Sequence, residues 1–140
     1  MTEERRQSPH VRILVVEDNK QNRELLVRVL HRWGYEQVEC LGDPREFMDR
    51  YRATEPELVF VDYRMPYLSG VELIGLMREE PGALERSRVV MLTGDSGASL
   101  AQEIVSQGAS AVITKPYVLN DLKELLERLV KELHGSQAES

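Results

Sequence analysis

The sequence predicts an α/β domain with a single doubly wound, five-stranded parallel sheet and helices on both faces. Short apolar segments alternate with amphipathic segments of helical spacing five times along the 140 residues. Two of the short segments are almost continuously apolar, as are strands that helices cover on both faces. The length allows one domain with one hydrophobic core, so the five short segments are expected to share one sheet.

The first strand is expected at residues 11–16, where VRILVV is apolar at nearly every position. Asn19 can cap the helix that follows; its apolar residues recur at helical spacing up to about Trp33, and Gly34 is a natural stop. Residues 36–41, EQVECL, alternate between polar and apolar side chains. This weaker pattern predicts a strand at an edge of the sheet.

The middle of the chain repeats the alternation. Asp43 followed by Pro44 marks the start of the second helix, because proline is well tolerated in a first helical turn. Residues 57–61, ELVFV, form the next buried strand, and a loop then leads to a short helix over 71–79. The fourth strand is expected at 88–92, RVVML.

Three elements remain: a weak helix over 97–107, a strand at 110–114 and the strongest helix of the chain, with Asn120 as its expected cap. One face of that helix carries Leu122, Leu125, Leu126, Leu129 and Leu133. The first and third strands are the most apolar and should be central, which gives the flavodoxin-like strand order 2-1-3-4-5. In such sheets ligands bind beyond the carboxyl ends of the strands, between strands 1 and 3.

Composition excludes several classes of function. The excess of 24 Asp and Glu over 18 Lys and Arg argues against direct nucleic acid binding, which requires a basic face. The single cysteine, Cys40, rules out an intramolecular disulfide and is expected to pack as a small apolar residue on a strand. No apolar run approaches the roughly 20 residues that span a bilayer, and the N-terminus does not resemble a signal peptide. We therefore expect no membrane partner and a cytoplasmic location, with a disordered leader at 1–9, the domain at 10–134 and a polar tail or the start of a linker at 135–140.

Polar and charged residues end four of the predicted strands at the same edge of the sheet. They are Glu17 and Asp18 after the first strand, Asp62 after the third, Thr93 after the fourth and Lys115 after the fifth. Three carboxylates in a partly dry crevice repel one another, and Lys115 alone leaves them net negative, so a hard cation is expected, with Mg²⁺ fitting best. Thr93 and Lys115 can hold phosphoryl oxygens. The set therefore predicts a phosphoryl acceptor site in which Asp62 is the nucleophile that becomes an acyl phosphate.

The segments that carry these residues resemble the receiver domain of response regulators in two-component signal transduction. The resemblance spans about 11–133 and rests on ILVVEDN, on D-x-x-M-P-x-x-x-G starting at Asp62, on MLTG with Thr93 and on ITKP with Lys115. It implies that Asp62 is the phosphoacceptor, that Thr93 is a switch hydroxyl that moves toward the phosphoryl group, and that Lys115 pairs with that group. The implied Mg²⁺ ligands are Glu17, directly or through water, Asp18, Asp62 and the backbone carbonyl of Arg64. A cis peptide bond between Lys115 and Pro116 is also implied.

The same resemblance implies a bacterial phosphorelay protein. A histidine kinase or a histidine phosphotransfer protein would donate the phosphoryl group, and the acyl phosphate would shift the surface formed by helix 4, strand 5 and helix 5. That surface would control a protein target in trans or an output domain outside these 140 residues. No enzymatic activity is implied beyond self-catalysed phosphotransfer and autodephosphorylation. The sequence leaves open a homodimer, the cognate kinase and target, and whether the chain is part of a longer regulator or hybrid kinase.

One position departs from the family pattern. Receivers usually carry an aromatic residue on strand 5, three positions before the lysine, and this chain has Val112 there. A β-branched side chain is stiff and has no ring to turn inward, so the usual coupling between the threonine and an aromatic ring is in doubt. Tyr117 either substitutes for that ring or packs on the last helix.

Two further pairs of residues carry hypotheses. Arg64 and Asp95 flank the expected pocket and could pair across its mouth, which would tune water access and the lifetime of the phosphoryl group. The segment VEDNKQNR, in which Asn22 and Arg23 follow the acidic pair, resembles the corresponding segment of receivers attached to hybrid histidine kinases. Alternatively, these two residues are ordinary polar residues on an exposed helix face.

Other classes of protein fit less well. A phosphorylation-independent pseudo-receiver, a protein-binding module with the same fold, usually lacks part of the acidic set or the lysine. A flavodoxin-like cofactor binder needs a phosphate-binding loop after strand 1, where this chain has the acidic EDNK. An aspartate-based phosphohydrolase typically has a second carboxylate two residues after the nucleophile, where this chain has Arg64. All three histidines lie at termini or helix ends, which argues against a histidine-centred site.

Overall fold

The computed structural model describes residues 10–95 and 97–139, so the expected leader at 1–9 and the last residue of the expected tail lie outside the described residues. Five parallel strands form one sheet in the order β2-β1-β3-β4-β5, which confirms the predicted topology. The strands are β1 (Ile13–Val16), β2 (Val38–Leu41), β3 (Leu58–Asp62), β4 (Arg88–Thr93) and β5 (Ala111–Thr114).

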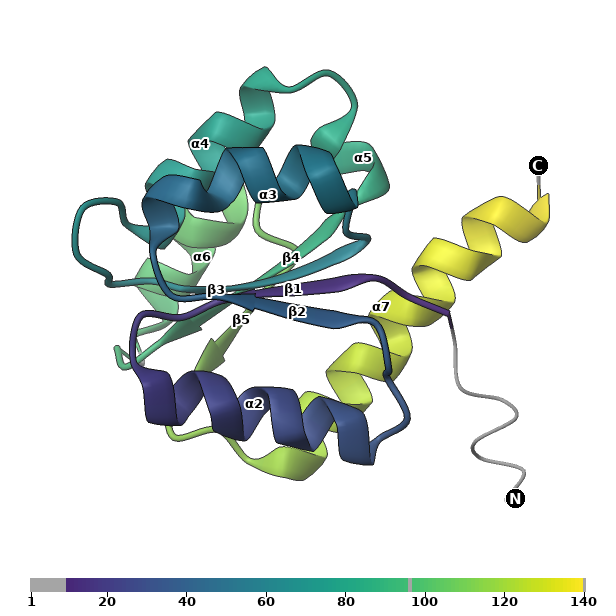
Figure 1. The fold of residues 1–140 in the computed structure, drawn as a ribbon, viewed down its shortest axis with the longest axis horizontal. Coiled ribbons are helices and arrows are strands. Elements are labelled where there is room, and N and C mark those ends of the chain that lie inside the picture. Colours follow the sequence, from purple (N-terminus) through teal and green to yellow (C-terminus); the bar gives the residue numbers. More distant parts are fainter. Residues whose placement is uncertain (1–9, 96, 140) are drawn as a thin grey trace.

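Helices cover both faces of the sheet (Figure 1). One face carries a 3₁₀ turn, η1 (Pro44–Glu46), and the helices α3 (Phe47–Thr54), α4 (Gly70–Glu79), α5 (Ala83–Arg86) and α6 (Ala98–Ser106). The other face carries α2 (Lys20–Arg32) and α7 (Leu119–Glu139). Among the described helices none is long and apolar enough to cross a bilayer.

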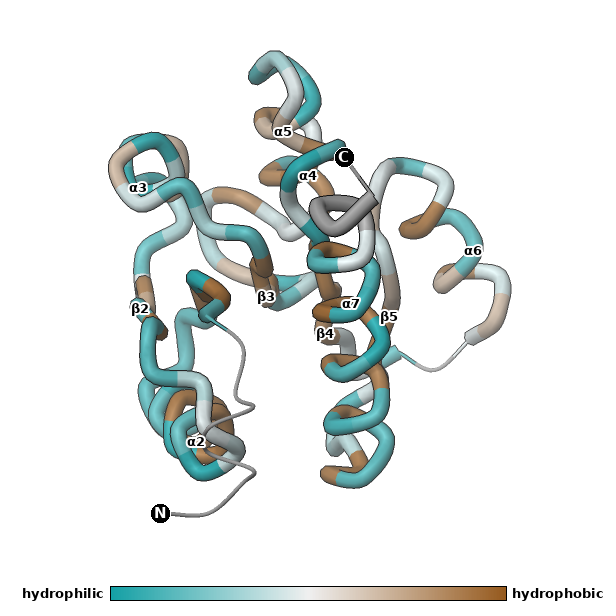
Figure 2. The backbone as a smooth tube through the Cα atoms, turned by 90° about the vertical axis from the view of Figure 1, so that its right-hand side faces the viewer, coloured by the Kyte–Doolittle hydropathy of each residue, from teal (hydrophilic) through white to brown (hydrophobic). Residues whose placement is uncertain are grey.

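The sheet separates two hydrophobic cores, and β1 contributes to both. Leu14 and Val16 pack toward α3, α4 and α6, while Ile13 and Val15 pack toward α2 and α7. All four side chains are buried, which explains why this strand is a continuous apolar run and not an alternating one. Hydrophobic residues recur along α7 at helical spacing, where they close the second core (Figure 2).

Local signals set several helix ends. The Asn19 side chain accepts a hydrogen bond from the backbone N–H of Asn22 at 2.9 Å, as predicted, and the backbone turns at Gly34 with a φ of 96°. Ser69 and Glu72 form a capping box that starts α4, a motif that the sequence analysis did not single out.

Two expectations about local structure are wrong. Asn120 is not the cap of α7, because that helix begins at Leu119 and the N–H of Leu122 already bonds to the carbonyl of Val118. The same helix continues to Glu139 and so includes most of the expected polar tail at 135–140. Cys40 lies on a strand but is exposed, because β2 is an edge strand and is covered less completely than the central strands.

The site lies on the opposite side of the molecule from the start of β1 and the end of α7. Residue 10 and the end of α7 are on the side of the sheet where the strands begin (Figure 1). The candidate functional residues lie on the other side, where the strands end.

Candidate functional site

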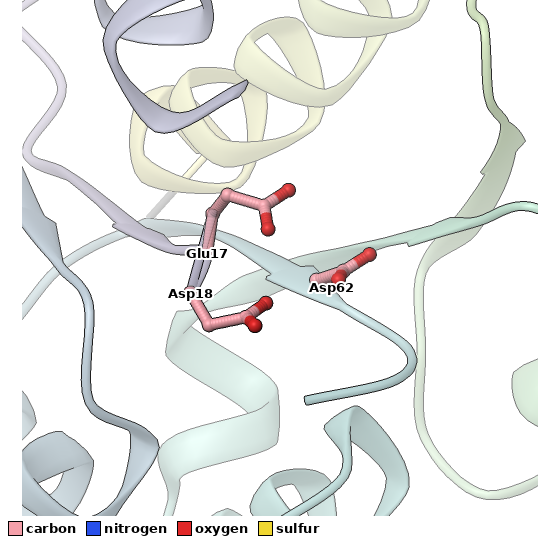
Figure 3. A group of neighbouring side chains, drawn as sticks. All are labelled: Glu17, Asp18 and Asp62. Carbon is pink, nitrogen blue, oxygen red and sulfur yellow. The ribbon is translucent and has the colours of Figure 1, made fainter. Parts of the chain in front are cut away.

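Three carboxylates meet where β1 and β3 end. Carboxylate oxygens of Glu17, Asp18 and Asp62 lie within 4.8 Å of one another, and the side chains point toward a common space (Figure 3). The register explains this convergence: Val16 pairs with Val61 across the two strands, so the residues that follow face each other at the edge. The predicted cluster is therefore present.

Two of these carboxylates are buried. Glu17 is 3% exposed and Asp62 is 6% exposed, whereas Asp18 is open to solvent. Burial raises the pKa of Glu17; the N–H of Asn19, which donates to its Oε2 at 3.1 Å, opposes the rise, and the Asp62 charge adds to it. A bound cation would reduce the repulsion between these buried carboxylates.

Lys115 reaches this cluster from the end of β5. Its Nζ lies 2.7 Å from Asp62 Oδ1 and 3.5 Å from Glu17 Oε1. Burial acts to lower the pKa of Lys115, but the hydrogen bond and charge of Asp62, together with Glu17, outweigh it and raise the pKa. One ammonium group against three carboxylates leaves the cluster net negative, and an all-oxygen donor set suits a hard divalent cation such as Mg²⁺. The residues present therefore fit the metal that the sequence predicts.

Thr93 ends β4 beside the cluster and is 2% exposed. Its Oγ1 accepts a hydrogen bond from the backbone N–H of Asp95 at 3.0 Å. The Asp95 carboxylate in turn pairs with Nη2 of Arg64 at 2.9 Å, which confirms the predicted ion pair. Both partners of this pair are largely exposed, so it contributes modestly to stability.

Val112 and Tyr117 lie on opposite faces of the sheet. Val112 packs against the core on the α6 side, whereas Tyr117 packs with the core formed by α2 and α7. Tyr117 therefore packs in the core that the last helix helps to form, on the other face of the sheet from Val112. The peptide bond between Lys115 and Pro116 is cis, as the resemblance implies.

The loop after β3 is fixed by contacts that sequence reasoning missed. Tyr67 has a φ of 75°, and the N–H of Leu68 bonds to the carbonyl of Pro66 at 2.9 Å across it. The guanidinium carbon of Arg45 lies 3.6 Å from the centre of the Tyr67 ring. No pattern in the sequence pairs these two residues, because they come from separate loops.

Gly70 closes the same loop at its base. Its N–H donates to the carbonyl of Tyr63 at 3.0 Å, and a Cβ added here would lie 2.8 Å from the carbonyl oxygen of Asp62. A larger residue would thus push on the backbone that carries Asp62. The glycine that ends the D-x-x-M-P-x-x-x-G motif has a steric reason.

Comparisons with known proteins agree with this geometry. The model of the response regulator receiver domain family matches residues 13–127. A probable chemotaxis protein CheY of Rhizobium etli is 26% identical over 117 residues, which are 84% of this chain and 90% of that protein. The response regulator MprA of Mycolicibacterium vanbaalenii is 33% identical over 121 residues, but this chain spans only 51% of its length.

Solved structures give the same answer. The chemotaxis response regulator CheY4 of Vibrio cholerae superposes with a TM-score of 0.78 at 26% identity, covering 86% of this chain and 99% of that one. With the family match over most of the chain, the strand order and the acidic cluster, the chain belongs to the response regulator receiver domain family of two-component signal transduction.

Proposed function

We propose that this chain is a phosphorelay receiver in which Asp62 accepts a phosphoryl group from a histidine kinase or a histidine phosphotransfer protein. One observation carries the proposal: buried Asp62 lies at the centre of a set that includes Glu17, Asp18 and Lys115, with Lys115 Nζ at 2.7 Å. In the transfer, an Asp62 oxygen forms a bond to phosphorus while the bond from phosphorus to the donor's imidazole nitrogen breaks, and that imidazole recovers a proton from solvent.

Receiver domains bind Mg²⁺ in an acidic pocket, and the cluster of Glu17, Asp18 and Asp62 supports the same role in this chain. Glu17, Asp18, Asp62 and the backbone carbonyl of Arg64 would hold the ion. When bound, Mg²⁺ supplies positive charge that offsets the carboxylates and the phosphoryl oxygens. Most of the catalysis is then positioning and electrostatics.

Lys115 and Thr93 supply the remaining contacts. The Lys115 ammonium would keep its place and pair with a phosphoryl oxygen on Asp62. The Thr93 hydroxyl would turn from the N–H of Asp95 to the phosphoryl group, and α6 begins shortly after that residue. This connection supports transmission of the signal to the surface of α6, β5 and α7, which would control a protein target or an output domain.

A different candidate is a protein-binding module that works without phosphorylation. Val112 favours it, because this stiff side chain packs where receivers usually place a mobile aromatic ring. The complete acidic set and the lysine favour the phosphorelay receiver.

Intact-mass spectrometry after incubation with Mg²⁺ and acetyl phosphate separates these functions. The wild type should gain one phosphoryl group, and Asp62→Ala should gain none. EDTA should abolish the gain in the wild type. If neither acetyl phosphate nor phosphorylated histidine kinases modify the wild type, the better conclusion is a protein-binding module that works without phosphorylation.

A further inference from the structure

Arg23 lies in the first turns of α2 and extends back toward the acidic edge. Its Nη1 donates to the backbone carbonyl of Glu17 at 2.9 Å and approaches that of Asp18 at 3.5 Å. The side chain is half-buried, unlike the other arginines of α2. Its hydrogen bonds thus go to the backbone of the acidic pair and not to the carboxylates themselves.

The backbone around Glu17 is held from both sides. The N–H of Glu17 donates to the carbonyl of Leu41 at 3.1 Å, which extends the β1–β2 ladder by one residue. On the other side, the carbonyl of Glu17 accepts from Arg23. After Glu17 the chain leaves the sheet and makes no further hydrogen bonds of the β1–β2 ladder. Arg23 therefore holds the backbone of the acidic pair where the ladder ends.

Gly42 provides the space for this guanidinium group. A Cβ built on Gly42 would lie 2.7 Å from Nη1 of Arg23 and 3.3 Å from its Cζ. Both atoms are at the end of a flexible side chain, so an alanine here would move the guanidinium without forcing the backbone. The backbone of Gly42 is also outside the positive-φ region, so alanine is compatible with it.

We propose that Arg23 is a positioning residue for the metal-binding acidic pair: it holds the Glu17 and Asp18 backbone in the geometry that binds Mg²⁺. The inference rests on the proposed function, since it concerns the ion that the acidic pocket would bind. Of the Asn22 and Arg23 pair that follows the acidic residues, it assigns this role to Arg23, whose guanidinium group bonds to their backbone.

The sign of the effect distinguishes positioning from charge. Removing a positive group near a cation site strengthens cation binding if only its charge matters. Removing a positioning residue weakens binding, because the ligands lose their fixed orientation. Arg23→Ala therefore gives opposite results under the two explanations.

The experiment is a titration with MgCl₂ followed by the amide NMR signals of residues 17–19, together with thermal unfolding of each metal-free protein. Arg23→Ala should weaken Mg²⁺ binding on the order of ten-fold. Gly42→Ala, which keeps the charge and displaces the guanidinium, should weaken it in the same direction. Arg23→Lys should recover part of the affinity, because an ammonium can still donate to one carbonyl.

Arg28→Ala is the matched control, since Arg28 is exposed on the same helix and its loss changes the net charge equally. It should leave Mg²⁺ affinity unchanged or slightly stronger. Unchanged or tighter binding in Arg23→Ala, or a lowered unfolding temperature with unchanged affinity, overturns the proposal. If the wild type shows no Mg²⁺-dependent shifts at residues 17–19, the proposed metal site fails first, and the result is then distinct from a failure at Arg23 alone.

Discussion

The Nζ atom of Lys115 contacts two buried carboxylates, those of Asp62 and Glu17. Lys115→Gln keeps similar bulk but leaves those charges uncompensated, so we expect metal-free protein to lose about 1–3 kcal/mol of unfolding free energy. Saturating Mg²⁺ should restore most of the loss, because the ion then supplies the missing charge. Urea unfolding with and without Mg²⁺ measures both effects. Lys123→Gln, an exposed change on α7, is the control, and equal losses in the two variants would contradict the expectation.

Arg64 and Asp95 form the ion pair that the sequence suggested. If the pair limits the access of water to a phosphorylated Asp62, Arg64→Ala should speed dephosphorylation about two- to five-fold, the range expected from an exposed ion pair. Asp95→Ala should have a similar effect, since either change breaks the same pair. Loss of the phosphoryl group can be followed by intact mass after removal of the donor. An unchanged rate in both variants would exclude this role.

The sequence predicts the residues of the site better than it predicts the contacts that hold the surrounding loops in place. Glu17, Asp62 and Lys115 are visible because each ends an apolar strand, and parallel strands end at one edge. The contact of Arg45 with Tyr67 depends on two loops meeting in space, which no local pattern encodes.

At the scale of single elements, α4 shows how much one cap contributes. Ser69 accepts the N–H of Glu72 at 3.2 Å, and the Glu72 side chain accepts the N–H of Ser69 at 2.9 Å. Ser69→Ala should cost about 1 kcal/mol of unfolding free energy, because the N–H of Glu72 loses its acceptor at the start of the helix. Ser99→Ala on α6 should cost less, since Ser99 is an exposed residue in the first turn of a helix whose cap residue is Gly97. Chemical unfolding of both variants provides the test, and equal costs would argue against the capping role.

Strands were easier to predict than helix ends. Apolar runs identify the central strands β1 and β3, since burial on both faces leaves few polar positions within them, and the weaker alternating pattern of residues 36–41 identifies the edge strand β2. The start of α7 was misplaced because asparagine is a common cap, whereas the structure begins this helix from Val118 without a polar side chain at that position. The short helix α5 has one turn and therefore no periodicity to detect.

Across the whole molecule, Tyr35 is a buried tyrosine of the second core, to which α2 and α7 both contribute. Burial, and then the charge of Glu127 on α7, raise the pKa of Tyr35 from 10.0 to about 12. Between these values the unfolded chain has lost the phenol proton and the folded protein retains it, so the folded state binds more protons and its stability falls as the pH rises. Unfolding free energies measured from pH 9 upward should decline more steeply for the wild type than for Tyr35→Phe. Parallel curves for the two proteins would show that Tyr35 does not contribute.

The opposed positions of the end of α7 and the acidic edge have a practical consequence (Figure 1). A protein coupled to a biosensor chip through a tag at the end of α7 is held by the side of the sheet where the strands begin. The acidic edge then faces the flowing solution, so association rates with donor proteins can be recorded without the support blocking their approach.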